Sequence, residues 1–144
     1  MLIGIPAILG PELLSTLRAM GHGDEIALVD ANYPAQEHAR RLVRADGHGI
    51  IALLQAILPL LPLDGDVTAP VMRAAQGNLP GQAGPIHRQI DGLVASLKPG
   101  TAVEPLGGDR LYPRIRAAHT IVATGELALY ANVILRKGVV GEVP

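Results

Sequence analysis

The sequence contains no cysteine, no tryptophan and no phenylalanine, and only three tyrosines among its 144 residues. The absence of cysteine excludes disulfides, thiolate nucleophiles and zinc–thiolate sites, and it is compatible with a reducing compartment. The core must therefore be built mainly from alanine, leucine, valine and isoleucine, and a chain of this length can bury one as a single domain over residues 1–144. The scarce tyrosines are Tyr33, Tyr112 and Tyr130.

An excess of charge of one sign is also missing. Twelve Lys and Arg residues nearly balance 13 Asp and Glu residues, which gives a net charge of −1. No basic run is present that could neutralise a row of phosphates, so we expect no nucleic-acid partner. Gln55, Pro59 and Pro62 interrupt the longest apolar stretch, which therefore stays short of the ~18 residues of a membrane span. The apolar N-terminus lacks a basic n-region, so we expect a cytoplasmic protein with no membrane partner.

Several functional motifs are absent as well. There is no GxGxxG sequence and no P-loop, and neither Ser15 nor Ser96 lies on a nucleophile elbow. No two of the five histidines are spaced three or four residues apart, which leaves no zinc or iron motif. We therefore expect no metal and no cofactor, and what remains is acid–base chemistry by side chains.

The periodicity of the apolar residues predicts an α/β fold. Strands that alternate with helices favour a single compact domain with a mainly parallel central sheet flanked by helices. We interpret 62–84, which is rich in proline and glycine, as an extended excursion and the least ordered part of the chain. The predicted helices are 10–21, 49–61, 85–97 and 111–118, the predicted strands are 25–30, 101–106, 119–124 and 132–140, and a short helix followed by a loop is predicted for 34–47.

The stretch "MGHGDEIALVDANYP" places a histidine between two glycines and directly before an apolar strand. Gly21 is predicted to end the preceding helix in the left-handed conformation and Gly23 to turn the backbone, so that His22 is held at a loop tip. Histidine gives and takes protons near neutral pH, and Asp30 ends the same strand. The two side chains reach one cavity only if the chain folds back or a neighbouring subunit completes the site. The plainer alternative is that each residue caps local structure.

A second group of polar residues follows in "TGELALYANVIL". Tyr130 and Asn132 are one residue apart, so an extended backbone points both side chains the same way. A phenol and a carboxamide both donate and accept hydrogen bonds, as sugar hydroxyls do. A buried tyrosine beside a turn asparagine is the alternative interpretation. Glu126 is either a turn acid or an interface residue, and His48, His87 and His119 are taken as surface or packing residues.

Taken together, "MGHGDEI", "RADG" and "TGELALYAN", in this order, resemble the sugar mutarotase family that contains L-fucose mutarotase and D-ribose pyranase. The resemblance runs from the N-terminus to about Val140. "PELL", "MGHGDEI" and "ILRKGV" are closer to the fucose branch, whereas "YAN" has the form found in the ribose branch.

The resemblance implies interconversion of monosaccharide anomers, and of pyranose and furanose rings, without a cofactor. It implies an α/β fold assembled into rings, commonly decamers, with the site shared between adjacent subunits of a homo-oligomer. By match to the motifs, His22 is the proton donor, and Asp30, Tyr130 and Asn132 bind the sugar. A sugar-binding accessory protein of a transport or regulatory system, without catalysis, is the alternative function.

One position departs from the family pattern. The family has a basic residue shortly before the helix that corresponds to 111–118, and counting back from "YAN" places Gly108 there. Arg110 lies two residues further on, and we consider it as a substitute ligand for the sugar. The departure leaves open which sugar the protein prefers.

Overall fold

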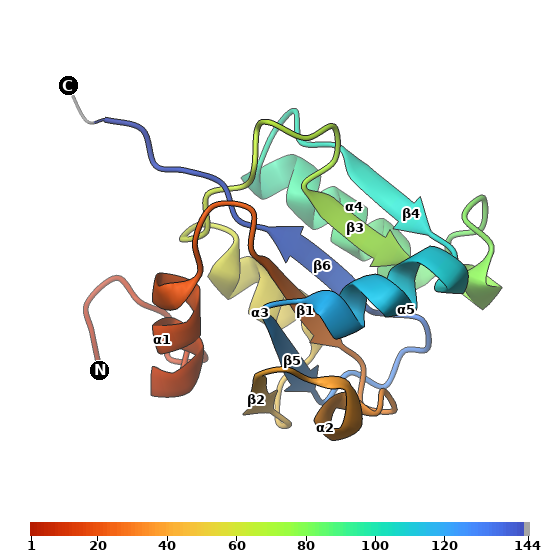
Figure 1. Cartoon of the computed structure of the whole chain (residues 1–144), viewed down its shortest axis with the longest axis horizontal. Helices are drawn as coiled ribbons and strands as arrows, with labels where there is room; N and C mark the ends of the chain where they lie inside the picture. Colours follow the sequence, from red (N-terminus) through yellow and green to blue (C-terminus); the bar gives the residue numbers. More distant parts are fainter. Residues whose placement is uncertain (143–144) are drawn as a thin grey trace.

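In the computed structural model, which describes residues 1–142, a six-stranded sheet runs through the centre of the chain (Figure 1). Its strands lie side by side in the order β2-β5-β1-β6-β3-β4. β6 runs antiparallel to its neighbours β1 and β3, and the other three pairings are parallel, which confirms the predicted mainly parallel sheet. The strands are β1 (Glu25–Val29), β2 (Leu42–Ala45), β3 (Val71–Ala74), β4 (Val103–Leu106), β5 (Thr120–Thr124) and β6 (Val133–Arg136).

Helices cover both faces of the sheet and make a three-layer domain. α1, α3 and α4 pack against one face, and α2 and α5 pack against the other. The helices are α1 (Pro11–Ala19), α2 (Ala35–His38), α3 (Ile50–Ile57), α4 (Pro85–Leu97) and α5 (Gly108–Ala117), with a short 3₁₀ turn at Gln76–Asn78.

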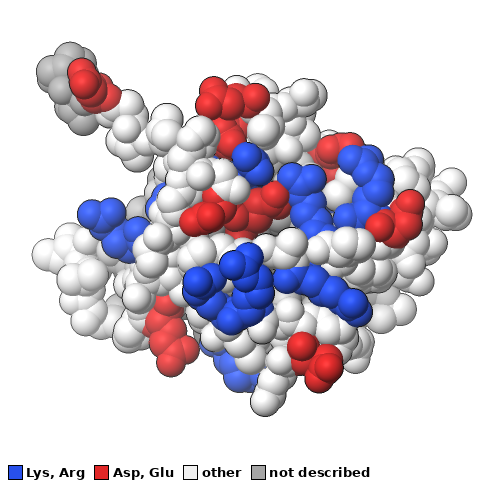
Figure 2. Space-filling view, viewed as in Figure 1, with Lys and Arg blue, Asp and Glu red and all other residues white. Residues whose placement is uncertain are grey.

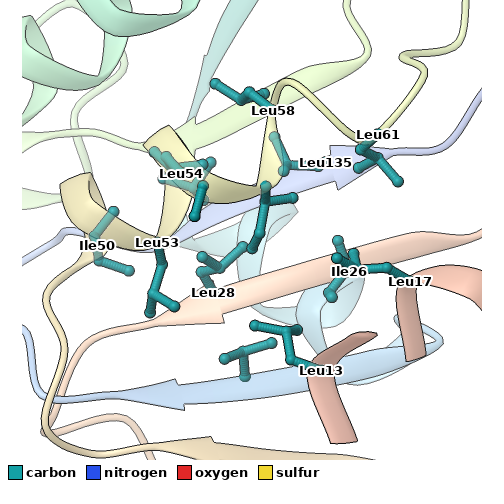
Figure 3. Close-up of a cluster of buried hydrophobic side chains, with 14 of the residues drawn as sticks. Leu13, Leu17, Ile26, Leu28, Ile50, Leu53, Leu54, Leu58, Leu61 and Leu135 are labelled. Atoms are coloured by element: carbon teal, nitrogen blue, oxygen red, sulfur yellow. The ribbon is translucent and has the colours of Figure 1, made fainter. Parts of the chain in front are cut away.

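The central strand β1 is apolar along its length because each of its faces is covered. Ile26 and Leu28 point into the core beneath α1 and α3, where Leu13, Leu53 and other leucines surround them (Figure 3). Ala27 and Val29 point to the opposite face, as the alternation of side chains along a strand requires. Each fully buried leucine or isoleucine contributes about 1.5–3 kcal/mol of transfer free energy, so this core is the main source of stability.

Two strands lie in segments for which the sequence predicted none. β2 follows α2 where a loop was predicted, and β3 lies inside the 62–84 excursion, with all four of its residues buried. Both predictions were wrong for one reason. Each strand has only four residues, and its partners β5, β4 and β6 come from distant parts of the chain, so local composition carries little sign of the pairing.

Several helix ends also differ from the prediction. α3 ends at Ile57, four residues before the predicted end at Leu61. α1 ends at Ala19, and Met20 already has an extended backbone while its side chain is buried in the core. The left-handed residue is Gly23, with φ of 85°, and Gly21 is not among the residues with positive φ. α5 begins at Gly108, three residues earlier than predicted.

Charged side chains are mixed on the surface. Figure 2 shows basic and acidic side chains interleaved on the face where α5 lies, with apolar and neutral side chains between them. Among residues 1–142, no helix is both long and apolar enough to cross a membrane.

Candidate functional site

Asp30 and Asn132 meet at the carboxyl end of β1. Because β6 runs antiparallel to β1, the residue that precedes β6 lies beside the residue that follows β1. The side-chain oxygen of Asn132 accepts a hydrogen bond from the Asp30 backbone N–H at 2.9 Å, and both residues are buried. The NH2 group of Asn132 is consequently the part of the amide that can donate to a ligand.

The Asp30 carboxyl group sits in a desolvated place. Burial raises its pKa above the usual value of 3.8, and the charge of Glu126 adds to the rise. Backbone N–H groups oppose the shift, and one of them, that of Asn32, donates to a carboxylate oxygen at 3.0 Å. A carboxyl group with a raised pKa in a cavity is typical of sites that bind ligands or exchange protons.

Tyr130 has a backbone conformation that residues other than glycine seldom adopt. Its φ is 57°, in the left-handed region. The Tyr130 carbonyl oxygen lies 2.7 Å from Nε2 of His87, which is fully buried on α4. Nδ1 of the same ring accepts the Gly84 N–H at 2.9 Å, so His87 is neutral and donates through Nε2. His87 is therefore a packing residue, as predicted, and it also anchors the turn that presents Tyr130.

Asp30, Tyr130 and Asn132 line a common cavity of about 490 Å³ at this edge of the sheet. The other two tyrosines, Tyr33 and Tyr112, line it as well. The volume lies in the range of small-molecule sites, and aromatic walls with a few convergent polar groups suit the apolar face and the hydroxyls of a sugar.

Sequence reasoning did not assign His38 and Arg116 to this cavity, although both line it. The scarcity of tyrosine was the one usable signal for Tyr33 and Tyr112. His38 and Arg116 gave none, because the face of a short helix that meets a cavity is decided by packing between distant segments.

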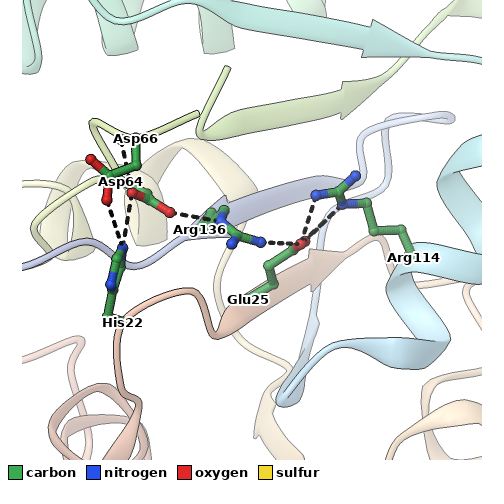
Figure 4. A network of polar contacts seen from close by, with 6 residues as sticks. All are labelled: His22, Glu25, Asp64, Asp66, Arg114 and Arg136. Carbon is green, nitrogen blue, oxygen red and sulfur yellow. Dashed lines mark hydrogen bonds and ion pairs between the residues drawn. The ribbon is translucent and has the colours of Figure 1, made fainter. Parts of the chain in front are cut away.

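His22 lies at the other end of β1, on the loop that Gly23 turns. Its side chain is 45% exposed, and Nε2 lies 3.1 Å from Oδ1 of Asp64 and 3.6 Å from Oδ2 of Asp66 (Figure 4). The Arg136 guanidinium, together with the Asp66 N–H and His22, holds the pKa of Asp64 at about 2. Asp64 is therefore an acceptor only, so Nε2 of His22 carries a proton, and Nδ1 is the ring atom that can serve a ligand.

A line of alternating charges extends from His22 to α5 (Figure 4). Nε of Arg136 donates to the second Asp64 oxygen at 2.7 Å, and Nη1 of Arg136 lies 3.6 Å from Glu25. The Arg114 guanidinium also holds Glu25, with Nη2 2.8 Å from the carboxylate. Asp64 is only 2% exposed, and this arrangement supports a buried carboxylate beneath a half-exposed imidazole.

His22, Asp64 and Asp66 are also the residues with donor atoms grouped as a cation would need, all within 4.8 Å of one another. Asp64 already accepts from Arg136, from His22 and from the Asp66 N–H. The guanidinium of Arg136 therefore already supplies, beside these carboxylates, the positive charge that a bound cation would bring.

The two halves of the predicted site are apart within one chain. A strand rises about 3.3 Å per residue, so the five residues of β1 separate His22 from the cavity with Asp30 by roughly 15 Å. The structure brings Asp30, Tyr130 and Asn132 together and leaves His22 at the opposite edge of the sheet. Of the two arrangements considered for the sequence, folding back of the chain does not occur.

Arg110, the predicted substitute ligand, points elsewhere in this chain. Its guanidinium donates to Glu104 at 3.1 Å and is well exposed. A side chain at position 108 would lie close to the cavity. A Cβ on Gly108 would be 2.8 Å from the ring of Tyr112, which lines the cavity, and 3.2 Å from the Asn78 side chain.

The "RADG" and "TGE" segments contact each other and act structurally. The Gly125 N–H donates to the His48 carbonyl at 2.8 Å, and a Cβ on Gly125 would overlap the Asp46 carbonyl oxygen. The Glu126 carboxylate accepts the N–H of Ile50 at the start of α3 and the N–H of Ala128. Glu126 is therefore a turn acid and a helix cap, the first of the two interpretations considered.

An open α/β sheet with a polar and aromatic cavity at a strand end is the arrangement typical of small-molecule-binding α/β proteins. The chain belongs to the RbsD / FucU transport protein family, whose model matches residues 3–140.

Named relatives match nearly the whole chain. The fucose mutarotase of Homo sapiens is 42% identical over 98% of this chain and 96% of the relative. The L-fucose mutarotase of Haemophilus influenzae (strain 86-028NP) is 41% identical, over 96% and 97% of the two chains.

Solved structures are similar as well. A fucose mutarotase from Streptococcus pneumoniae in complex with L-fucose has a TM-score of 0.84 at 43% identity, covering 97% of this chain and all of that one. The RbsD of Bacillus subtilis complexed with D-ribose has a TM-score of 0.73 at 19% identity, covering 98% of this chain and all of that one, and is similar in fold.

Proposed function

We propose that the protein is a mutarotase of the isomerase class that interconverts the anomers of L-fucose or a closely related monosaccharide. The observation that carries the proposal is that Asp30, Tyr130 and Asn132, chosen from the sequence motifs, line one cavity of about 490 Å³. Identity of 42% with a fucose mutarotase over nearly the full chain supports the same function.

The reaction needs an acid and a base, and no cofactor. An acid protonates the ring oxygen while a base takes the proton of the anomeric hydroxyl, and the bond between the anomeric carbon and the ring oxygen breaks. The aldehyde rotates and closes again with the roles reversed, so that the opposite anomer forms. We propose no metal, and exchange should persist unchanged after treatment with a chelator.

His22 is the proposed acid. The ionised Asp64 accepts from Nε2 of His22 and thereby leaves Nδ1 as the atom that delivers the proton. Nε2 of His22 lies 3.1 Å from Asp64 and 3.6 Å from Asp66, which fixes the orientation of the ring. The half-exposed ring stands where a neighbouring molecule can reach it.

Asp30 and Asn132 are the proposed ligands for sugar hydroxyls. The buried Asp30 carboxylate accepts, and the NH2 group of Asn132 donates. Tyr130 adds its ring and hydroxyl from a turn anchored by His87. The proposed guanidinium neighbour of the sugar is Arg116, which lines the cavity, whereas Arg110 is paired with Glu104 in the same chain.

A working site then requires two copies of the chain. His22 of one copy would meet the cavity of its neighbour, since the two lie at opposite ends of β1 within one chain. A closed ring satisfies this need because every copy in it has one neighbour on each side. The proposed decamer consists of two such rings. Light scattering should give a multimer, and a single species near 15.0 kDa would contradict the assembly.

The decisive experiment is exchange spectroscopy by NMR on the anomers of L-fucose, with D-ribose measured in parallel. Faster exchange of L-fucose anomers in the presence of the protein establishes the mutarotase. Saturation transfer from protein to sugar without faster exchange would instead establish the sugar-binding accessory protein. Exchange between ribose pyranose and furanose forms would place the activity with the pyranases.

Cell fractionation tests the proposed cytoplasmic location.

A further inference from the structure

Three side chains, two from the α2 segment and one from α5, form a line of hydrogen bonds at the cavity. His38, at the end of α2, lies with Nδ1 2.9 Å from the Tyr33 hydroxyl oxygen. Nη2 of Arg116, on α5, lies 3.0 Å from Nε2 of the same imidazole. All three residues line the cavity that contains Asp30.

Chemistry decides the direction of each of these hydrogen bonds. A guanidinium has donors only, so Nε2 of His38 must accept from Arg116. An imidazole that accepts at Nε2 is neutral and carries its single proton on Nδ1, so Nδ1–H donates to the Tyr33 oxygen. The hydroxyl proton of Tyr33 is then not used in the bond with His38 and is available to another acceptor.

We propose that Arg116 and His38 orient the Tyr33 hydroxyl as a hydrogen-bond donor into the cavity, so that Tyr33 contacts a sugar oxygen and selects the sugar. This inference rests on the proposed function for the nature of the ligand. Tyr33 is the residue that touches the sugar, and His38 is a positioning residue that acts through it.

The surroundings of Tyr33 fit this role. Its ring stacks on that of Tyr112, with centroids 6.2 Å apart and an angle of 27° between the planes, which holds the phenol against the cavity wall. Burial raises the pKa of Tyr33 above 10.0 although Arg116 opposes the shift, so the hydroxyl keeps its proton at neutral pH. Asp30 offers acceptor oxygens in the same cavity. A ligand with both a hydroxyl donor and an oxygen acceptor, as neighbouring positions of a monosaccharide have, satisfies both.

The first test reads the His38 tautomer directly. Long-range ¹⁵N–¹H spectra of the protein with labelled histidine, recorded well above neutral pH, distinguish Nδ1–H from Nε2–H, and the His38 signal is assigned by its loss in His38→Gln. We expect the Nδ1–H tautomer, and we expect Arg116→Met to abolish that preference. An Nε2–H tautomer in the wild type would overturn the proposal whatever the protein does to sugars.

The second test measures L-fucose affinity in matched variants. Tyr33→Phe keeps the ring and removes the donor, and it should raise the dissociation constant roughly three- to tenfold, the usual value of one hydrogen bond. His38→Leu should produce a similar loss, and combining it with Tyr33→Phe should add little. His38→Gln, which can accept from Arg116 and donate to Tyr33, should restore part of the affinity. Glu37→Gln, next in sequence and exposed, is the control and should match the wild type.

The results separate this inference from the proposed function. A wild type that neither binds L-fucose nor accelerates anomer exchange refutes the proposed function and, with it, the sugar contact of Tyr33. A wild type that binds and exchanges L-fucose while Tyr33→Phe and Glu37→Gln behave alike refutes the donor role of Tyr33 alone. A circular dichroism spectrum identical to that of the wild type shows that each variant is folded.

Discussion

His22 and Asp30 flank the same strand, β1, from opposite ends, with five strand residues between their loops. His22 contacts Asp64 at one edge of the sheet, and Asp30 contacts Asn132 at the other. One sugar cannot touch both residues of the same chain, so we expect the proposed activity to need at least two copies of the chain.

Complementation between two inactive variants should reveal the shared site. His22→Ala should lower anomer exchange by roughly 100-fold, the usual effect of a positioned acid. Asp30→Asn should also inactivate the site, because it removes the carboxylate proposed to accept from the sugar. When the two variants are co-expressed in equal amounts, activity should return at about a quarter of the sites. Random assembly places an intact His22 beside an intact Asp30 of the neighbouring copy at about one site in four. Co-expression of His22→Ala with a variant that carries both His22→Ala and Asp30→Asn is the control and should restore no activity. Equal inactivity of both mixtures would contradict a site shared between copies.

The stability conferred by Asp64 should depend on pH in a defined window. Its pKa is lowered from 3.8 to about 2, chiefly by the hydrogen bond from Arg136. A carboxyl group with a depressed folded-state pKa stabilises the fold above its unfolded pKa, and this contribution is lost as the pH falls through the folded value. The difference in melting temperature between the wild type and Asp64→Asn should therefore be constant above pH 4 and shrink toward pH 2. A difference that persists at the lowest pH would show that the charge of Asp64 is unimportant.

Loss of His87 should affect the sugar site through Tyr130. His87→Leu leaves the Tyr130 carbonyl and the Gly84 N–H without the ring that now pairs with them, at a cost of about 1–3 kcal/mol for each buried group left unpaired. Chemical denaturation measures this loss. Because the turn at Tyr130 also loosens, the KM for L-fucose should rise. His87→Gln, whose amide can replace one of the two hydrogen bonds, should recover part of both losses.

A methyl group at Gly125 should destabilise the protein although the residue binds no ligand. A Cβ there would overlap the Asp46 carbonyl oxygen, so the "RADG" and "TGE" segments would have to separate, at a cost of about 1–3 kcal/mol. Gly92→Ala, at an open position on α4, is the matched control and should not destabilise the fold. Equal melting temperatures for the two variants would disprove the close approach.

Removal of the Arg110 guanidinium should leave the affinity for the sugar almost unchanged. Arg110 pairs with Glu104 at the surface, and exposed pairs of this kind are worth about 0–1 kcal/mol. Arg110→Ala should therefore bind L-fucose with nearly wild-type affinity, as calorimetry can measure. A loss of tenfold or more would assign Arg110 to the sugar and would favour the contact expected from the sequence.

The sequence by itself determined the elements whose apolar pattern is long and regular. The strand at β1 and the helices α1, α3 and α4 were predicted close to their observed positions, because burial of an amphipathic or wholly apolar segment depends on its own residues. The motifs around Asp30, Tyr130 and Asn132 were sufficient to propose a common sugar site, and the observed cavity contains all three.

Only the tertiary structure decided which distant segments meet. β2 and β3 are strands because partners far away in the chain pair with them, and His38 and Arg116 join Tyr33 at the cavity because α2 and α5 pack on the same face of the sheet. The separation of His22 from Asp30 likewise follows from the straight course of β1 through the core. Such contacts depend on the pairing of surfaces across the whole fold, and a local pattern of residues does not contain that information.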